Sequence, residues 1–301
     1  MIAVRRILCP VDLSEFSARA LEHAVALARW YRADVDVVHV FTATLPPPLF
    51  AGEPGPAALT AVSRQRVEEA VREFIAPLTP SEVPVSVTIL EGTAATRILD
   101  HVRESASDLI VIGTHGRSGF ERLLLGSVTE KVIRKASCPV LTVPPRVEES
   151  ATEPVVAFKR IVCAIDFSRS SVKSLEYALS LAQEAGARLT LLHVLDWPDV
   201  AAGRDPIDRA LAEARQHTLD DLARRLHRAV PDEVRTWCDP EEVIVTGSPH
   251  REIVRVAGEK SAELIVMGVH GRGALDLTLF GSTASYVVRH AACPVLTVRS
   301  G

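Results

Sequence analysis

Hydrophobic and polar positions follow two alternating periods along the chain. Short apolar runs of strand length alternate with stretches in which apolar residues recur every three to four positions, the period of a helix. After the β-rich run at 3–8, for example, Ala20, Leu21, Ala24, Leu27 and Ala28 lie on one helical face. In the first half, the pattern predicts strands at 3–8, 35–41, 83–90, 109–112 and 139–143, and helices at 20–31, 58–74, 94–103 and 127–135. The apolar run at 35–41, interrupted by Asp36 and His39, predicts a strand largely buried on both faces.

The second half of the chain repeats the first. Residues 7–14 match residues 161–168 at an offset of 154, and residues 113–117 match 268–272 at an offset of 155. The hexapeptide at 138–143 recurs unchanged at 293–298. The second half is therefore predicted to carry strands at 161–165, 189–194, 243–245, 264–267 and 294–298. A period this long indicates a tandem duplication of a whole domain, not a solenoid.

The duplication sets the expected domain boundaries. We expect one domain at 1–145 and a second at 157–301, joined by a linker at 146–156. Prolines and charged residues around this join favour an extended, solvated segment. A second proline-rich stretch, 45–56, is predicted to be a surface loop between a strand and a helix.

Five short apolar strands separated by helices predict parallel βαβ units with right-handed crossovers. Each domain is expected to be a doubly wound five-stranded parallel sheet with helices on both faces. Ligands bind such sheets beyond the carboxyl ends of the strands, where the strand order reverses. Candidate chemistry is therefore sought immediately after each strand.

Composition narrows the partners. The 301 residues are 47% hydrophobic and 24% charged, which excludes a disordered polyelectrolyte, and the net charge of −4 gives no general attraction for nucleic acid. No apolar run approaches the ~18 residues of a membrane span. The run after Arg5 and Arg6 is too short for a signal peptide. The five cysteines form no paired CxxC motif, as expected for a protein of the reducing cytoplasm.

A glycine pattern follows the fourth strand of each half. Its spacing is G-x2-G-x9-G-S, formed by Gly113, Gly116, Gly126 and Ser127, and again by Gly268, Gly271, Gly281 and Ser282. Glycines let the backbone approach an anion, and a helix that begins after them attracts phosphate through its free N–H groups. The alternative is that the glycines only turn the chain and that residues 127–130 form a capping box. In the second half the acidic member of that box is replaced by Ser285.

These motifs together resemble the universal stress protein family. The resemblance rests on the glycine pattern, on the Pro-Val-Asp and Ala-Ile-Asp strand ends, and on the Cys-Pro-Val-Leu-Thr-Val terminal strand. It covers nearly the whole chain twice, and the glycine pattern is the signature of the ATP-binding branch of the family. The resemblance implies two flavodoxin-like, adenine-nucleotide-hydrolase-like α/β domains. Each would bind ATP, with Mg²⁺, at the strand ends.

The resemblance also implies roles for individual residues. Asp12 and Asp166 match the acidic residue that contacts the nucleoside, and a carboxylate can accept ribose hydroxyl hydrogens. Their alternative role is to cap the following helix together with Ser14 and Ser168. Val40 and Val194 match the position whose backbone reads adenine. The strand ends before the aspartates differ from each other, with Pro10 in one half and Ala164 in the other, so the second half departs from the family pattern at the adenine wall.

Arginines, histidines and cysteines in or near these motifs are further candidate residues. Arg117 and Arg272 follow the second glycines and could reach a phosphate, although a loop arginine is commonly only solvated. His115 and His270, between the glycines, have no acid or nucleophile beside them, and His39 and His193 read as core histidines. No metal-ligand spacing is present, and Cys138 and Cys293 read as buried apolar residues. The lysine-containing phosphate loop and the G-x-S-x-G elbow are both absent from the sequence.

The sequence therefore predicts a nucleotide-dependent stress-response regulator with one ATP site in each domain and no assigned catalytic residue. The alternatives are a slow ATP-hydrolysing enzyme assisted by the loop histidines, and an interaction module without nucleotide. In the resembled family the last strand is often a dimer edge. The two identical last strands are thus expected to pair within the chain as a pseudo-dimer, and two chains could associate further.

Overall fold

The computed structural model describes residues 2–42, 56–116, 125–145, 156, 158–197, 206–269 and 280–300, with the backbone alone for 56–63 and 206–210. Apart from the two N-terminal residues, the chain divides into a first unit, Ala3–Val156, and a second unit, Ala157–Gly301. The predicted linker at 146–156 and the predicted loop at 45–56 lie outside the described residues except for their last positions.

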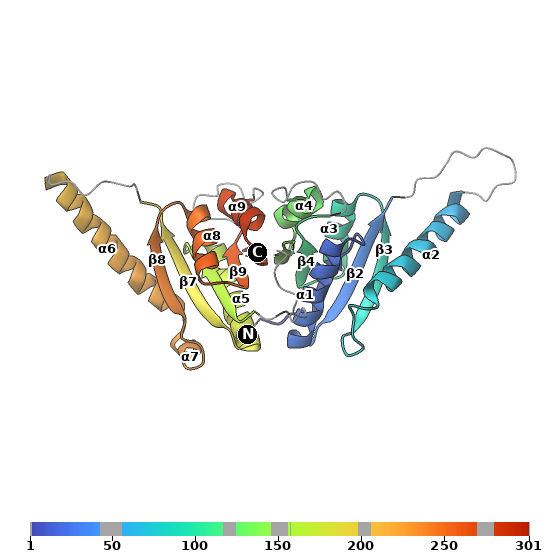
Figure 1. The fold of residues 1–301 in the computed structure, drawn as a ribbon, viewed down its shortest axis with the longest axis horizontal. Helices are drawn as coiled ribbons and strands as arrows, with labels where there is room; N and C mark the ends of the chain where they lie inside the picture. The colour runs from blue at the N-terminus through green and yellow to red at the C-terminus, as the bar shows by residue number, and fades with distance from the viewer. Residues whose placement is uncertain are drawn as a thin grey trace. The chain divides into compact units, whose positions relative to one another are not determined.

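Strands and helices alternate in both units (Figure 1). The first unit contains β1 (Arg6–Pro10), α1 (Glu15–Tyr31), β2 (Asp34–Phe41), α2 (Pro56–Ile75), β3 (Val85–Glu91), α3 (Ala94–Glu104), β4 (Leu109–Gly113), α4 (Ser127–Lys135) and β5 (Val140–Val143). The second contains β6 (Arg160–Ala164), α5 (Arg169–Ala185), β7 (Arg188–Leu195), α6 (Pro206–Ala229), α7 (Asp232–Arg235), β8 (Glu241–Thr246), α8 (Pro249–Glu259), β9 (Leu264–Gly268), α9 (Ser282–His290) and β10 (Val295–Val298). The predicted strands and helices are present, and the short helix α7 is an addition.

The first strand begins later than predicted. It was expected at 3–8, but β1 starts at Arg6. The backbone N–H groups of Arg5 and Arg6 both donate to the Asp108 carboxylate, at 2.8 and 3.0 Å. The side chain of Asp108, the residue before β4, thus holds the backbone at the point where β1 begins.

Each unit has a parallel five-stranded sheet. The strand order is β3-β2-β1-β4-β5 in the first unit and β8-β7-β6-β9-β10 in the second. The order reverses between β1 and β4, and equivalently between β6 and β9, as in a doubly wound sheet. Doubly wound folds bind ligands beyond the carboxyl ends of the strands at such a reversal, and the region beyond the ends of β1 and β4, or of β6 and β9, is called the crevice below.

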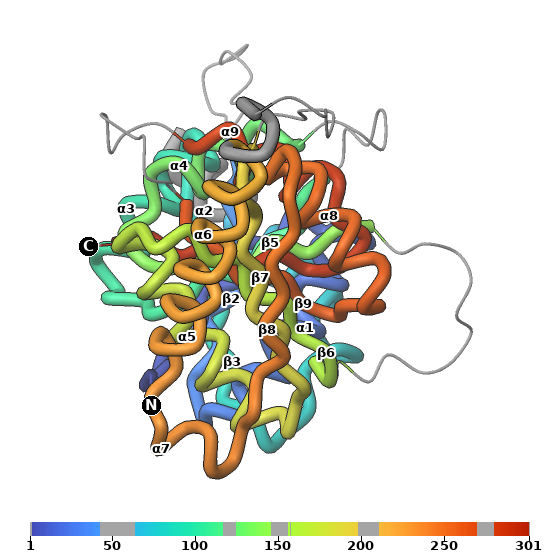
Figure 2. Tube along the Cα trace, turned by 90° about the vertical axis from the view of Figure 1, so that its left-hand side faces the viewer, coloured from blue at the N-terminus to red at the C-terminus, as the bar shows by residue number. Residues whose placement is uncertain are grey.

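Helices cover both faces of each sheet. Helix α1 packs across β1, β4 and β5 and contacts α2, whereas α3 packs on β2 and contacts α4. In the second unit, α5 packs on β6, β9 and β10, and α8 contacts β7 and α9. Helix α6 lies along β7 and β8, as Figure 2 shows. No helix among the described residues combines the length and the hydropathy that crossing a membrane requires.

The second strand departs from the expected burial. It is buried from Val35 to Val38, but His39, Val40 and Phe41 are only partly buried. The last residue of β1 that pairs with β2 is Pro10, opposite Val38, so β2 extends beyond its neighbour. The end of β2 therefore borders the crevice instead of lying inside the sheet.

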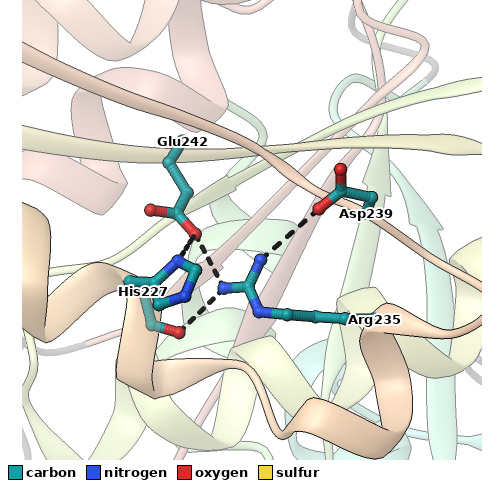
Figure 3. Close-up of polar contacts among 4 residues, drawn as sticks. All are labelled: His227, Arg235, Asp239 and Glu242. Carbon is teal, nitrogen blue, oxygen red and sulfur yellow. Dashed lines mark hydrogen bonds and ion pairs between the residues drawn. The ribbon is translucent and has the colours of Figure 1, made fainter.

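The turn between α6 and β8 is anchored by Arg235. Its Nη2 atom donates to Glu242 Oε1 at 2.7 Å and to the His227 carbonyl at 2.8 Å, and its Nη1 atom contacts Asp239 at 3.4 Å (Figure 3). His227 Nδ1 also contacts Glu242 Oε1 at 3.0 Å. The Arg235 side chain is only 17% exposed. One guanidinium thus joins the end of α6, α7 and the edge strand β8.

Candidate functional site

Asp12 and Asp166 lie at the reversal point, two residues beyond β1 and β6. Asp12 Oδ1 accepts two hydrogen bonds from one residue, the Ser14 backbone N–H at 3.1 Å and the Ser14 hydroxyl at 2.5 Å. Asp166 Oδ1 is held in the same way by Ser168, at 2.9 and 2.6 Å. The two units therefore present a half-buried carboxylate at the same place and in the same orientation.

The following helix is capped by the serine, not by the aspartate. Ser14 is the N-cap of α1 and its Oγ accepts the Ser17 N–H, while Ser168 caps α5 and accepts the Ser171 N–H. The alternative role for Asp12 and Asp166 was to cap the helix together with Ser14 and Ser168, and in the structure the serines make the cap bond. Each aspartate supports the capping serine through Oδ1 and does not itself bond the first helical turn in these contacts.

The residue between aspartate and serine has a left-handed backbone. Leu13 and Phe167 both have φ of 63°, although neither is a glycine. Such a conformation costs on the order of 1 kcal/mol in a non-glycine residue and persists only where the surroundings hold it. Here it turns the chain sharply from the strand end into the helix. The only sequence signal for this turn is the repeated spacing Asp-x-Ser-x-x-Ser.

Gly116 lies against the Asp12 carboxylate. A Cβ atom added at Gly116 would stand 2.8 Å from Asp12 Oδ2. The fold thus brings together two predicted site residues that are far apart in the sequence, because β1 and β4 are neighbours. The corresponding Gly271, together with Arg117 and Arg272, lies outside the described residues.

The first glycine of each pattern is explained by packing. A Cβ at Gly113 would approach the Phe16 carbonyl oxygen to 3.1 Å, and a Cβ at Gly268 would meet Ser170 Oγ at 2.6 Å. At these two positions the space that a side chain would need is taken by α1 and α5. This differs from the interpretation that the glycine makes room for an anion.

The third glycine of each pattern begins a helix. Gly126 is the N-cap of α4 and donates its N–H to the Thr114 carbonyl at 2.8 Å, and Gly281 is the N-cap of α9 and donates to Val269 at 3.1 Å. The predicted capping box at 127–130 is therefore wrong, because Ser127 is the first helical residue and not the cap.

The first turns of α4 and α9 follow N-cap residues that have no side chain. Gly126 and Gly281 therefore make no side-chain cap bond, and both Ser127 and Ser282 are exposed. The N–H groups of an uncapped first turn, with the positive end of the helix dipole, attract anions. The Thr114 and Val269 contacts place both helix starts at the crevice.

The ends of β2 and β7 turn backbone groups toward the crevice. The Val38 carbonyl accepts from Val11, so Val38 faces β1, and Gly92 donates to the Phe41 carbonyl on the opposite side. Because backbone groups alternate sides along a strand, the N–H and C=O of Val40 face the side where β1 has already ended. Val194 lies equivalently, two residues beyond Leu192, the last residue to pair with β6.

The strand ends before the aspartates differ in side chain only. Pro10 and Ala164 are both buried and pair with equivalent residues, Val38 and Leu192. Replacing the proline ring by a methyl group changes the apolar wall of the second crevice but leaves its strand register unchanged.

The strand histidines are bonded to the backbone. His39 Nδ1 contacts the Val11 carbonyl at 2.8 Å, and His193 Nδ1 contacts the Ile165 carbonyl at 2.6 Å. Both thus act as structural residues that hold the segment leading to the aspartate, although His39 is only half-buried. His115 Nδ1 contacts Thr114 Oγ1 at 2.9 Å, and His270 lies outside the described residues.

The thiols are unsuited to redox chemistry. Burial raises the pKa of Cys163, Cys138 and Cys293 to about 12 and also raises the pKa of Cys9. Only a minute fraction of each is thiolate near neutral pH, and the thiolate is the reactive form. Within the described ranges, no three histidine, cysteine, aspartate or glutamate side chains group as a metal site.

Known proteins match both the sequence and the fold. The model of the universal stress protein family matches residues 3–144 and again 157–299. A universal stress protein of Methanocaldococcus jannaschii is 34% identical over 142 residues, which are 46% of this chain and 81% of that protein. One from Mycolicibacterium smegmatis is 27% identical over 97% of this chain and 96% of that protein.

Two further comparisons extend this result. A universal stress protein of Mycobacterium tuberculosis is 31% identical over 64% of this chain, and the match spans 62% of that protein's own length. The crystal structure of a universal stress protein from Archaeoglobus fulgidus, 23% identical, superposes with a TM-score of 0.65 over 98% of this chain and 96% of that one. This last likeness shows the shared fold.

The fold and the crevice define a tandem of doubly wound α/β domains with equivalent polar sites at their reversal points. The family model matches each of these domains almost from end to end. The chain therefore belongs to the universal stress protein family.

Proposed function

We propose that this chain is an ATP-binding regulator of the stress response with one nucleotide site in each unit. The observation that carries the proposal is the repeated arrangement at the reversal point. Three features lie at the same edge of the sheet in both units. They are the aspartate carboxylate held by a serine, the backbone at the end of β2 or β7, and the helix that begins at a glycine.

Each part of the site suits one part of ATP. Asp12 and Asp166 would accept ribose hydroxyl hydrogens, and the backbone of Val40 and Val194 would bond the edge of adenine. The N–H groups at the starts of α4 and α9 would bind phosphate oxygens. Residues of the glycine-containing loops and of the helix starts complete the proposed set: Gly116, Arg117, Ser127, Gly271, Arg272 and Ser282.

Magnesium would accompany the nucleotide. Mg²⁺ prefers oxygen ligands, keeps several waters and is commonly held by substrate phosphates with few protein groups. The exposed hydroxyls of Ser127 and Ser282, at the helix starts, fit this requirement. When bound, the ion would neutralise phosphate charge, while the protein would orient the nucleotide.

We propose regulation and not catalysis as the main role. A general base must lie within hydrogen-bond reach of an attacking water. His115, the loop histidine that the structure describes, directs Nδ1 to its own neighbour Thr114. Any turnover of ATP is expected to be slow.

The molecular context forms part of the same proposal. We place the domains at 1–145 and 157–301, joined by a linker at 146–156, and the protein in the cytoplasm. The strands β5 and β10 have the identical sequence Val-Leu-Thr-Val and each ends the parallel sheet of its own unit. A strand at the end of one sheet can pair with the end strand of another. Their pairing would make the chain a pseudo-dimer, and a second chain could add a homodimer.

Nucleotide release and titration test the proposal. Denaturing the purified protein and separating the released compounds by chromatography should identify an adenine nucleotide, or added ATP with Mg²⁺ should bind in calorimetry. The double variant Gly116→Val, Gly271→Val should bind at least about tenfold more weakly, because the added side chain displaces the carboxylate. Gly258→Ala is the control, since nothing lies within 4 Å of its added Cβ. A wild-type protein that neither carries nor binds ATP at millimolar concentration would refute the proposal.

A further inference from the structure

One serine in each unit links the candidate ligand-binding carboxylate to the start of a helix. Ser14 donates both its N–H and its hydroxyl to Asp12 Oδ1, while its Oγ accepts the Ser17 N–H at 3.3 Å. Ser168 makes the same three contacts with Asp166 and Ser171, the last also at 3.3 Å. The network is thus a property of both units.

These contacts fix the direction of the carboxylate. A carboxylate on a single side-chain bond can rotate, and its two oxygens can exchange places. Two donors from one residue, on the same oxygen, fix the plane of the carboxylate and therefore the direction of its other oxygen. Hydrogen bonds to an ionised group are shorter and stronger than neutral ones. The other oxygen of Asp12, Oδ2, is thereby directed toward Gly116, on the crevice side.

We propose that Ser14 and Ser168 are positioning residues that set the preference of both sites for a ribose over a deoxyribose. The inference rests on the proposed nucleotide function. Because Oδ1 is engaged by the serine, a sugar hydroxyl must be received by Oδ2 from one direction. Without the serine hydroxyl, only the backbone N–H still holds Oδ1, so the carboxylate is less firmly oriented and the sugar hydroxyl loses its fixed acceptor.

The same helical turn contains a matched control. Ser17 Oγ accepts the Asp12 backbone N–H at 3.3 Å and donates to the Ser14 carbonyl at 2.9 Å. Ser171 does the same in the second unit, at 3.3 and 3.0 Å. In these contacts, both serines bond the backbone of the turn and not the carboxylate. Their loss should loosen the turn without freeing the carboxylate.

The experiment compares ligands and variants by calorimetry. The ligands are ATP, its 2′-deoxy and 3′-deoxy analogues, and inorganic triphosphate, each with Mg²⁺. The variants are Ser14→Ala with Ser168→Ala, Ser17→Ala with Ser171→Ala, and Ser14→Thr with Ser168→Thr. In the first variant, ATP should bind about tenfold more weakly and triphosphate unchanged, because one charge-assisted hydrogen bond is lost.

The ratio of ATP to deoxy-ATP affinity is the decisive readout. Wild type should prefer ATP over at least one deoxy analogue, the Ser14→Ala, Ser168→Ala variant should lose that preference, and the threonine variant should restore it. The Ser17→Ala, Ser171→Ala variant should keep the preference even if its melting temperature falls. If the first double variant lacks the circular dichroism spectrum of a folded chain, each single alanine variant is titrated for the same ratio.

Two results separate the inference from the function on which it rests. A wild type that does not bind ATP overturns the proposed function and the inference with it. A wild type that binds ATP overturns the inference alone in either of two cases: it lacks a ribose preference, or the alanine variants at Ser14 and Ser168 retain that preference unchanged.

Discussion

Asp12 and Asp166 illustrate how a residue acquires its role from its neighbours. In the sequence each is an acidic residue that ends an apolar strand. The structure adds a serine that engages one carboxylate oxygen, and in the first unit a glycine beside the other. The serine lies two residues from the aspartate in the sequence and belongs to the same local motif. The glycine follows a different strand, β4, and is distant in the sequence.

Asp36 is a residue whose partner could not be read from the sequence. It interrupts an apolar strand, yet only 8% of it is exposed. Its carboxylate contacts His101 Nε2 at 2.6 Å and accepts the Thr88 hydroxyl at 2.9 Å. Thr88 comes from β3, which pairs with β2, and His101 comes from α3, which packs on β2, so the contact depends on tertiary structure. In the second unit, Thr190 occupies the equivalent strand position.

A pair of glycine substitutions tests the packing beside the site. Gly268→Ala should destabilise the chain by about 1–3 kcal/mol, because overpacking forces shifts in a close-packed interior. The added Cβ would meet Ser170 at 2.6 Å from Oγ and 2.9 Å from the backbone carbon. Urea unfolding followed by circular dichroism measures the change.

The control for that substitution is Gly258→Ala. This glycine lies in α8, and nothing is within 4 Å of its added Cβ. Alanine there should stabilise by about 0.5–1 kcal/mol through its higher helix propensity. Equal effects of the two substitutions would contradict the packing explanation for Gly268.

Helix starts are the elements that distinguish the crevice. Helices α1 and α5 begin at serine caps that are bonded to aspartates, so their first turns are satisfied by the protein itself. Helices α4 and α9 begin at glycines without a described side-chain cap. The sequence predicted α4 at the observed residues, 127–135, and left a capping box at 127–130 as an alternative, whereas the structure has its N-cap at Gly126. Ser127 and Glu130 have the spacing of a capping box whether or not the serine precedes the helix.

The edge strand β8 offers a test of element packing. Arg235→Ala should lower the free energy of unfolding by about 1–3 kcal/mol, because the mostly buried Glu242 carboxylate loses a charged partner. In this variant, the amide hydrogen exchange of peptides covering β8 and the end of α6 should become faster. Glu242 is 24% exposed, which separates this contact from a surface ion pair.

An exposed pair on α6 is the matched comparison. Arg224 and Asp221 are 3.7 Å apart and both 59% exposed. Arg224→Ala should change the free energy of unfolding by no more than about 0.5 kcal/mol, since surface pairs contribute little. If this variant loosens β8 as much as Arg235→Ala, the anchoring role assigned to Arg235 is wrong.

The whole molecule is two copies of one domain, and this was readable in advance. The repeats at offsets of 154 and 155 residues correspond to two units with the same strand order. Among the described residues, the two copies also differ, and the differences lie outside the repeated motifs. The helix α7 and its Arg235 anchor occur in the second unit, and the Asp36–His101 contact in the first.

The proposed sites predict a stoichiometry for the intact chain. Wild type should bind two ATP molecules, and Asp12→Asn and Asp166→Asn should each leave one site of unchanged affinity. The amide keeps the shape of the carboxylate but loses one acceptor and the charge. Equilibrium dialysis with labelled ATP and Mg²⁺ counts the sites. Loss of both sites in one single variant would show that the units do not bind independently.

The sequence by itself determined the duplication, the order of strands and helices, and the residue types at the crevice. These depend on local periodicity and on motifs of a few residues, which are encoded along the chain. Tertiary structure decided that helix packing takes the space beside Gly113 and Gly268, that Gly116 lies against Asp12, and that β2 extends beyond the end of β1. Each of these depends on which strands are neighbours and where each strand stops. Such contacts join residues that are distant in sequence, so no local pattern specifies them.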